Sequence, residues 1–176
     1  MSVLPDYLAP GLRVVFCGTA VGKRSAEVGG YYAGAGNEFW GILFEVGLIT
    51  EPLGPHLSHR VLDFGIGLTD LAKNVAASSN RGLEAEYDIV GFIHKIEEYE
   101  PTWVAFNGID AAKPVASHLA GRRGVALGEQ PWMIARSRIF VCPSMSASNR
   151  NPRNWAGRSS REEWFRDLAK LVRDTP

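Results

Sequence analysis

The chain has 176 residues, with 45% hydrophobic side chains and equal numbers of basic and acidic ones, 19 of each, as is usual for a globular protein. This length suits one domain with a sizeable core, and the neutral net charge excludes a uniformly basic coat for nucleic acids. No apolar run approaches the roughly 20 residues of a membrane span, and the first residues do not form a leader, so we expect a cytoplasmic protein with no membrane partner.

The charges are distributed unevenly along the chain. Residues 1–121 carry 8 Lys and Arg against 14 Asp and Glu, whereas residues 122–176 carry 11 against 5. This asymmetry indicates an anion-binding face near the C-terminus, although a solvated surface would look the same. The two cysteines, Cys17 and Cys142, lack the spacing of metal ligands, so we expect buried thiols, no metal and no cofactor.

The first predicted strand and the segment after it organise the chain. After an irregular lead-in over residues 1–11, the run Leu12–Cys17 is short, apolar and rich in β-branched residues, which predicts a buried strand ending at Gly18. A glycine-rich loop follows, and Asn37 is a good N-cap for a helix over about residues 37–48. Ligands of open α/β sheets bind beyond the carboxyl ends of the strands, so we expect chemistry in this loop.

The middle of the chain alternates short apolar runs with helical patterns. The predicted elements are a strand over 60–64, a crevice-facing loop over 65–70, a helix over about 84–98, a strand over 102–106, a helix over about 110–119 and a turn containing Arg122 and Arg123. The alternation is typical of units in which a helix connects two parallel strands.

The last third of the chain predicts a hairpin, a loop and a closing helix. Residues 132–135 and 139–142 form the hairpin-like pair of strands, and a capping box of Ser160 and Glu163 begins the helix. Together the elements predict an α/β fold of three layers, α/β/α. Its central, mostly parallel, twisted sheet has four to five strands, in one domain over residues 1–176.

Several short motifs resemble those of one family and occur in the same order. They are Ala9–Gly18, Tyr32, Gly36-Asn37, Phe39-Trp40, Gly65–Thr69, Phe106–Gly108 and Pro143–Ala147. They resemble the mismatch-specific uracil-DNA and thymine-DNA glycosylases of the uracil-DNA glycosylase superfamily, over nearly the whole chain. The resemblance implies a monofunctional enzyme that flips uracil, mispaired or paired, out of DNA and hydrolyses its N-glycosidic bond, leaving an abasic site and free uracil.

The resemblance also assigns residues to a base pocket. Tyr32 matches the aromatic residue that stacks on the extruded base, and Asn37 matches the family asparagine before the aromatic pair, although N-capping alone explains Asn37. Backbone N–H groups of the Thr19–Gly22 loop and the Asn107 amide are expected to donate to the departing base. Glycines such as Gly18 permit the main chain to approach closely.

The first motif departs from the family pattern at Ala20. The family has an asparagine there that positions the attacking water, and losing one positioned polar group commonly costs about 3–4 kcal/mol. Asp70 is the candidate replacement, since another branch of the superfamily also carries an aspartate at what we take to be this place. The alternative is that Asp70 caps a turn. Asp63 lies inside an apolar run, where a structural hydrogen bond is the simpler interpretation.

The loop over residues 143–150 matches the family motif that grips the DNA backbone and inserts a residue into the gap left by the flipped base. The inserting position matches Ser148, which is too small to fill a gap, so Asn149 or Arg150 is the alternative. The predicted DNA contacts are Ser144, Ser146, Ser148, Asn149, Arg150 and Arg153.

A basic surface is expected beside this loop, and its binding to phosphates should weaken with salt. Its predicted members are Arg150, Arg153, Arg158 and Arg161. Two other functions are compatible with the sequence: a glycosylase for hypoxanthine or xanthine, since the altered first motif could change the pocket, and a non-catalytic binder of damaged DNA. We expect a monomer.

Overall fold

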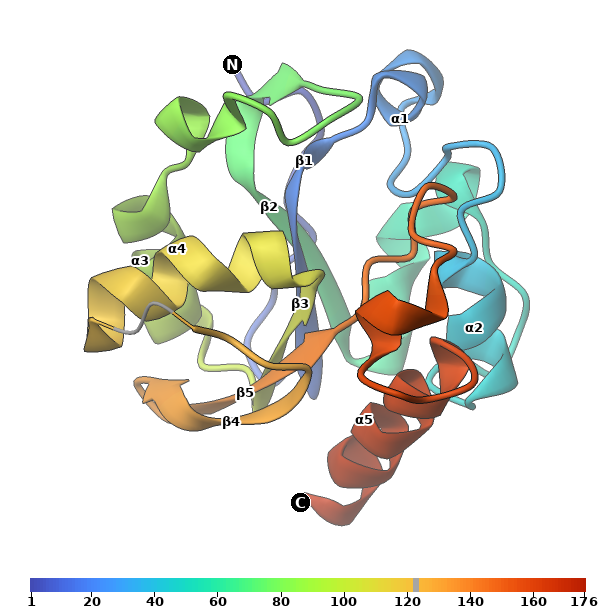
Figure 1. Ribbon diagram of the computed structural model, residues 1–176, viewed down its shortest axis with the longest axis vertical. Helices are drawn as coiled ribbons and strands as arrows, with labels where there is room; N and C mark the ends of the chain where they lie inside the picture. The colour runs from blue at the N-terminus through green and yellow to red at the C-terminus, as the bar shows by residue number, and fades with distance from the viewer. Residues whose placement is uncertain (122–123) are drawn as a thin grey trace.

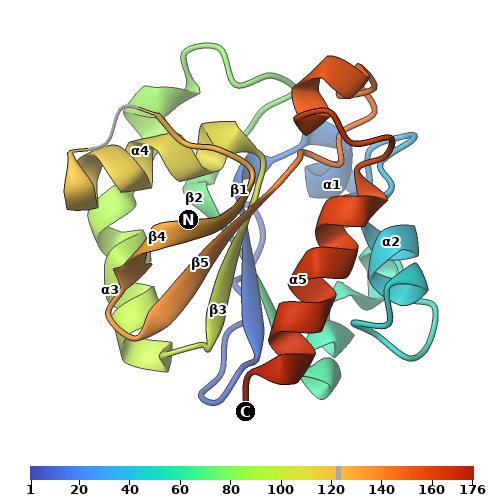
Figure 2. The same cartoon turned by 60° about the horizontal axis from the view of Figure 1, so that its bottom comes forward.

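The computed structural model describes residues 1–121 and 124–176. In this part of the chain, five strands form one sheet between two helical layers, which is the predicted α/β/α arrangement (Figures 1 and 2). The strands are β1 (Val14–Val21), β2 (Ile66–Ala76), β3 (Trp103–Asn107), β4 (Gly128–Ile134) and β5 (Ser137–Cys142). Their spatial order is β2-β1-β3-β5-β4, with β4 antiparallel to β5 and the other neighbours parallel.

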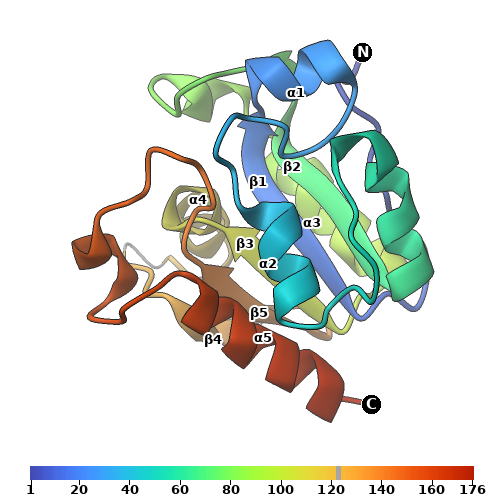
Figure 3. The ribbon, with the colours of Figure 1, turned by 90° about the vertical axis from the view of Figure 1, so that its right-hand side faces the viewer.

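The helices cover the two faces of the sheet separately. They are α1 (Lys23–Val28), α2 (Phe39–Glu45), α3 (Ile89–Tyr99), α4 (Ile109–Ala120) and α5 (Glu162–Asp174), with 3₁₀ helices η1 (Pro55–Phe64), η2 (Leu83–Glu86) and η3 (Pro152–Trp155). Helices α2 and α5 lie on one face and α3 and α4 on the other (Figure 3). Each face therefore has its own apolar core, one around Phe16 and Phe165 and the other around Phe92 and Phe106.

The N-terminal segment covers the edge of the sheet at β2. Tyr7 forms an antiparallel bridge with Leu68, and the Val3 N–H donates to the Lys73 carbonyl at 2.7 Å. These bonds satisfy backbone groups that an open edge strand would leave exposed. The predicted irregular lead-in is thus tied to the sheet, and it places Asp6 beside β2.

The prediction of a strand over 60–64 followed by a loop over 65–70 is wrong. Residues 55–64 form η1, which ends at Gly65 in the left-handed conformation (φ 68°), and the strand begins at Ile66. Residues 66–72 are all buried, including Thr69 and Asp70, so polar side chains inside the strand made it resemble a loop.

The first strand is longer than predicted and the glycine-rich segment is not wholly a loop. β1 continues beyond Gly18 because its pairing with β2 extends to Ala20 opposite Ala72. Residues 23–28 then form the short helix α1. The expected backbone donors at Thr19 and Ala20 therefore belong to a strand.

The remaining predictions need smaller corrections. Helix α2 begins at Phe39, although the Asn37 side chain still accepts from the Phe39 N–H at 3.0 Å. Helix α3 begins later than expected, with Asp88 as its N-cap. The β4–β5 hairpin is confirmed, whereas the Ser160 cap is wrong because Ser159 pairs with Glu163. The predicted turn at Arg122 and Arg123 lies outside the described residues.

Candidate active site

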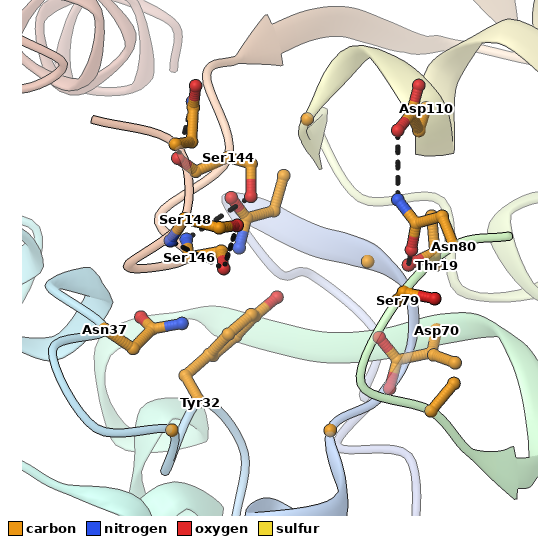
Figure 4. A pocket seen from close by; sticks show the side chains of 18 of the residues that line it. Thr19, Tyr32, Asn37, Asp70, Ser79, Asn80, Asp110, Ser144, Ser146 and Ser148 are labelled. Atoms are coloured by element: carbon orange, nitrogen blue, oxygen red, sulfur yellow. Dashed lines mark hydrogen bonds between the residues drawn. The ribbon is translucent and has the colours of Figure 1, made fainter. Parts of the chain in front are cut away.

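The register of the sheet brings three predicted site residues to one edge. β1 pairs Gly18 with Asp70 of β2, and β3 ends at Asn107, which pairs with Cys142 of β5. Because these strands are parallel, their carboxyl ends meet at the same edge, and the chain leaves β5 there through Pro143. A cleft of about 960 Å³ occupies this edge (Figure 4).

Most of the predicted residues line this cleft, and they come from five different segments. They are Gly18, Thr19, Ala20, Tyr32, Asn37, Asp70, Asn107, Ser144, Ser146, Ser148 and Asn149. Arg150 and Arg153 are exposed and lie outside that lining. The structure thus brings the expected base-binding residues and the candidate acid together, and it separates two of the expected DNA contacts from them.

Asp70 forms part of the floor of the cleft. The residue is 3% exposed, and its carboxyl group lies against the Gly18 backbone. A Cβ atom on Gly18 would lie 2.6 Å from Asp70 Oδ1, so only glycine leaves room for this carboxyl group. Burial raises the pKa of Asp70 to about 7, although the nearby Lys73 and the Gly18 backbone act to lower it. A carboxyl group with this pKa can hold or release a proton near neutral pH.

A group of ion pairs lies next to Asp70 on the β2 edge. Asp6 contacts Lys73 Nζ at 2.8 Å and Lys95 Nζ at 2.7 Å, and it accepts from Thr69 Oγ1 at 2.7 Å. Burial acts to raise the pKa of Asp6, but these three partners outweigh it and hold the pKa below its usual value. Lys73 therefore has a fixed place, from which its charge opposes the effect of burial on Asp70.

Tyr32 extends into the cleft from the segment between α1 and α2. Its backbone has a φ of 56°, which is uncommon for a residue other than glycine, and such strain often accompanies function. One face of its ring packs on Phe39, with centroids 3.9 Å apart, and its hydroxyl end points toward the middle of the cleft (Figure 4). Burial, and then the Asp70 carboxylate, raise the pKa of the hydroxyl, which therefore stays protonated.

Arg161 holds the loop over residues 143–150 in place. Its Nη1 donates to the carbonyls of Ser144 at 2.9 Å and Ser146 at 2.8 Å, and its Nη2 pairs with the Glu38 carboxylate. The prediction that Arg161 belongs to a basic surface is wrong, because the residue is 5% exposed and its donors are used inside the protein.

Asn107 holds the same loop from the opposite side. Its Oδ1 accepts from the Met145 N–H at 3.1 Å, which fixes the orientation of the amide and leaves its NH₂ group to donate elsewhere. The Asn149 side chain adds a bond from Nδ2 to the Ser144 carbonyl at 3.0 Å. Asn149 is thus part of the loop's own support, which makes it a poor choice for an inserting residue.

The cations near the cleft differ from those predicted. Arg158 pairs with Asp167 at 2.7 Å and stacks on the Trp164 ring at 3.6 Å, so its membership of the predicted basic surface is also wrong. Arg150 donates from Nε to the Ala147 carbonyl at 3.0 Å but stays exposed. The exposed cations that line the cleft are Lys23, Arg24 and Lys113.

Sequence reasoning missed a polar bridge at one end of the cleft. Thr19 Oγ1 donates to Asn80 Oδ1 at 2.9 Å, and Asn80 Nδ2 donates to Asp110 Oδ2 at 3.0 Å (Figure 4). The bridge joins β1 to the loop after β2 and to the first turn of α4. The polar run Ser78-Ser79-Asn80 begins two residues after the end of β2, so a correct assignment of that strand would have pointed to it.

Both cysteines are buried, Cys17 on the α3–α4 face and Cys142 on the α2–α5 face. Within residues 1–121 and 124–176, no three His, Cys, Asp or Glu side chains are arranged to bind a metal ion. Over the same residues, none of the helices is both long and apolar enough to cross a membrane.

The fold and the cleft define an α/β protein with a polar pocket at the carboxyl ends of its parallel strands. Residues 5–169 match the Uracil DNA glycosylase superfamily, and the chain belongs to this family, as the motifs predict. The structure is also similar to the solution NMR structure of a "putative Uracil DNA glycosylase" from Methanosarcina acetivorans. The TM-score is 0.63 at 20% sequence identity, and the match covers 97% of this chain and 96% of that one.

Proposed function

We propose that this protein is a monofunctional DNA glycosylase that hydrolyses the N-glycosidic bond of uracil in DNA, leaving an abasic site and free uracil. Membership of the superfamily supports a DNA glycosylase. The observation that carries the proposal is the buried carboxyl group of Asp70, which lies beside Gly18 on the floor of the cleft.

The catalytic role falls to Asp70 because Ala20 has no polar side chain. An ionised carboxylate on the cleft floor can accept a proton from water and stabilise the cationic sugar of a dissociative transition state. The cleft lysines, Lys23 and Lys113, are exposed on its rim rather than buried beside Asp70. This placement favours attack by water over attack by an amine.

The base is recognised by Tyr32 and Asn107. The face of the Tyr32 ring opposite Phe39 offers a stacking surface, which is worth about 1–3 kcal/mol per base in general. The Asn107 amide is fixed by Met145, so it presents N–H donors. A donor suits the carbonyl oxygen of a deaminated base and not the amino group of its parent base.

DNA binds across the mouth of the cleft to a single copy of the chain. Ser144, Ser146 and Ser148 offer hydroxyl groups to phosphates, and the exposed cations Arg150 and Lys23 supply positive charge. Arg150 is the better candidate for the inserting residue because Ser148 is small and Asn149 is tied to Ser144.

One observation favours a larger base as a second candidate substrate. The cleft holds about 960 Å³ and its wall at Gly18 and Ala20 carries no long side chain, so hypoxanthine or xanthine would meet little steric opposition. Both bases carry the carbonyl oxygen that the Asn107 donors require.

A panel of duplex oligonucleotides tests the function. Each carries one uracil, hypoxanthine, xanthine or thymine opposite a defined base, with an undamaged duplex as control, and excision is measured in single turnover with enzyme in excess. We expect abasic product from uracil, and strand cleavage only after alkali. If only hypoxanthine is excised, the substrate is hypoxanthine and not uracil. Tight binding without any product would show that the protein binds damaged DNA and does not cleave it.

A further inference from the structure

Two polar atoms on the cleft floor are buried without a hydrogen bond. Among the residues that the structure describes, Tyr32 Oη and Asp70 Oδ2 have no partner. Buried polar atoms in folded proteins are almost always paired, so each orphaned atom calls for an explanation. Asn107 lies close enough to Tyr32 to affect its hydroxyl, but the two groups do not meet in hydrogen-bonding geometry.

Both side chains lie next to Gly18. A Cβ atom built on Gly18 would lie 2.6 Å from Asp70 Oδ1 and 3.8 Å from Tyr32 Oη. Both groups therefore line the same part of the cleft. The unbonded Oδ2 belongs to this carboxyl group, and the Tyr32 hydroxyl does not bond to it. A molecule the size of water that met both groups there would have two polar partners, the minimum for holding it in place.

The chemistry of the two groups is complementary. The Tyr32 hydroxyl remains protonated and offers a donor, whereas an ionised Asp70 only accepts. Packing of the Tyr32 ring on Phe39 fixes the direction of the hydroxyl. One group can thus donate to the oxygen of a water molecule while the other accepts one of its protons.

We propose that Tyr32 is a second catalytic residue, whose hydroxyl and the Asp70 carboxylate together hold the attacking water in the cleft. This inference rests on the proposed function. The water oxygen forms a bond to C1′ of the deoxyribose, the C1′–N bond breaks with its electron pair on the departing base, and a water proton passes to Asp70. The base anion then takes a proton from solvent, Asp70 returns its proton to solvent, and Tyr32 keeps its own proton throughout.

The Tyr32→Phe variant tests this role because it removes the hydroxyl and retains the ring. In single-turnover excision of uracil, we expect a rate about tenfold to hundredfold lower, with unchanged affinity for a substrate whose fluorinated sugar resists hydrolysis. The matched control is Tyr87→Phe, which removes a hydroxyl outside the cleft and should excise at the rate of the unaltered protein. Thermal unfolding should show no loss of stability in Tyr32→Phe, since the lost hydroxyl has no partner.

A double-mutant cycle with Asp70→Asn tests whether both groups act on one water molecule. If they do, adding Tyr32→Phe to Asp70→Asn should lower the rate less than threefold. Full additivity would overturn the shared water, and a Tyr32→Phe rate equal to that of the unaltered protein would overturn the role of the hydroxyl. Loss of affinity without loss of rate would also overturn it. Absence of abasic product from the unaltered protein on every lesion would instead contradict the proposed function.

Discussion

The loop over residues 143–150 and the floor of the cleft differ in how far their polar groups are hydrogen-bonded. On the side of the loop 143–150, carbonyls and N–H groups are bonded to Arg161, Asn107 and Asn149, and the loop is held from both sides. On the floor, Tyr32 and Asp70 each keep a buried polar atom unbonded within the described residues. The loop therefore acts as a rigid support, whereas the floor keeps unpaired polar atoms that can bind a molecule entering the cleft.

The largest expected effect comes from breaking the support of the loop. Arg161→Met removes two charged hydrogen bonds to the loop carbonyls and frees the half-exposed Glu38, so we expect the free energy of unfolding to fall by about 2–4 kcal/mol. Urea denaturation measures this loss. The control Arg166→Met removes the pair between an exposed arginine and Glu162 one turn away on α5, and it should cost less than about 1 kcal/mol. Equal losses of unfolding free energy in the two variants would contradict a supporting role of Arg161 for the loop.

Removing the Asp70 carboxylate should lower the rate of excision rather than the stability of the fold. Asp70→Asn is expected to slow excision by about a hundredfold to a thousandfold with little change in DNA affinity. The control is Asp63→Asn, since Asp63 is exposed and pairs with Arg60 at 3.3 Å on the surface. Single-turnover rates and binding titrations separate the two effects, and undiminished excision by Asp70→Asn would remove this residue from the mechanism.

The raised pKa of Asp70 predicts how excision depends on pH. Because catalysis needs the ionised form, the single-turnover rate should rise about tenfold per pH unit below pH 7 and level off above it. A rate that stays constant between pH 5 and 8 would contradict this assignment.

The same pKa fixes the sign of a stability change. Folding raises the pKa of Asp70 from 3.8 to about 7, so the folded protein binds this proton more tightly than the unfolded chain. The contribution of Asp70 to stability is therefore complete below about pH 4 and is lost as the pH rises through 7. Urea denaturation should show Asp70→Asn gaining stability relative to the unaltered protein across that interval, by an amount on the order of a few kcal/mol. A constant difference across the interval would be the contrary result.

Two substitutions at Asn107 sharpen the comparison, because its amide oxygen supports the loop and its NH₂ group is the proposed donor to the base. Asn107→Ala leaves the Met145 N–H without its acceptor and should cost about 1–3 kcal/mol of unfolding free energy. Asn107→Asp keeps the acceptor and loses the NH₂ donors, so it should retain most of the stability and lose base recognition. If both variants lost the same stability, the contact with Met145 would not be what holds the loop.

The smallest expected effect belongs to an exposed cation. Arg150→Ala should weaken DNA binding modestly and reduce the slope of log affinity against log salt by about 1, as loss of one phosphate contact requires. Titrations at several salt concentrations measure the slope. Arg158 already pairs with Asp167, so Arg158→Ala should leave the slope unchanged.

The location of the site could be predicted from sequence because it depends on local patterns. Apolar runs ending at Cys17, Phe106 and Cys142 marked three of the strands, although the first continues to Val21, and parallel strands bring their carboxyl ends together. The second strand could not be recognised, because Thr69 and Asp70 interrupt its apolar pattern. Thr69 is buried there only because Asp6, distant in sequence, supplies a partner.

The roles of the charged and polar side chains were less predictable than the positions of the strands. A count of charges does not distinguish Arg161, which is buried under a loop, from Arg150, which is exposed. The bridge from Thr19 through Asn80 to Asp110 joins three segments of the chain, so no local pattern contains it. Contacts between distant segments decided these cases.

The N-terminal segment that pairs with β2 also carries Asp6, so residues outside the cleft contribute to the charge around Asp70. Removing the chain ahead of Tyr7 would remove Asp6, the counter-ion that Lys73 and Lys95 share, so the positive charge of the two lysines would act on Asp70 without compensation. An affinity tag attached before Met1 should therefore be removed by a cleavage that leaves Asp6 in place.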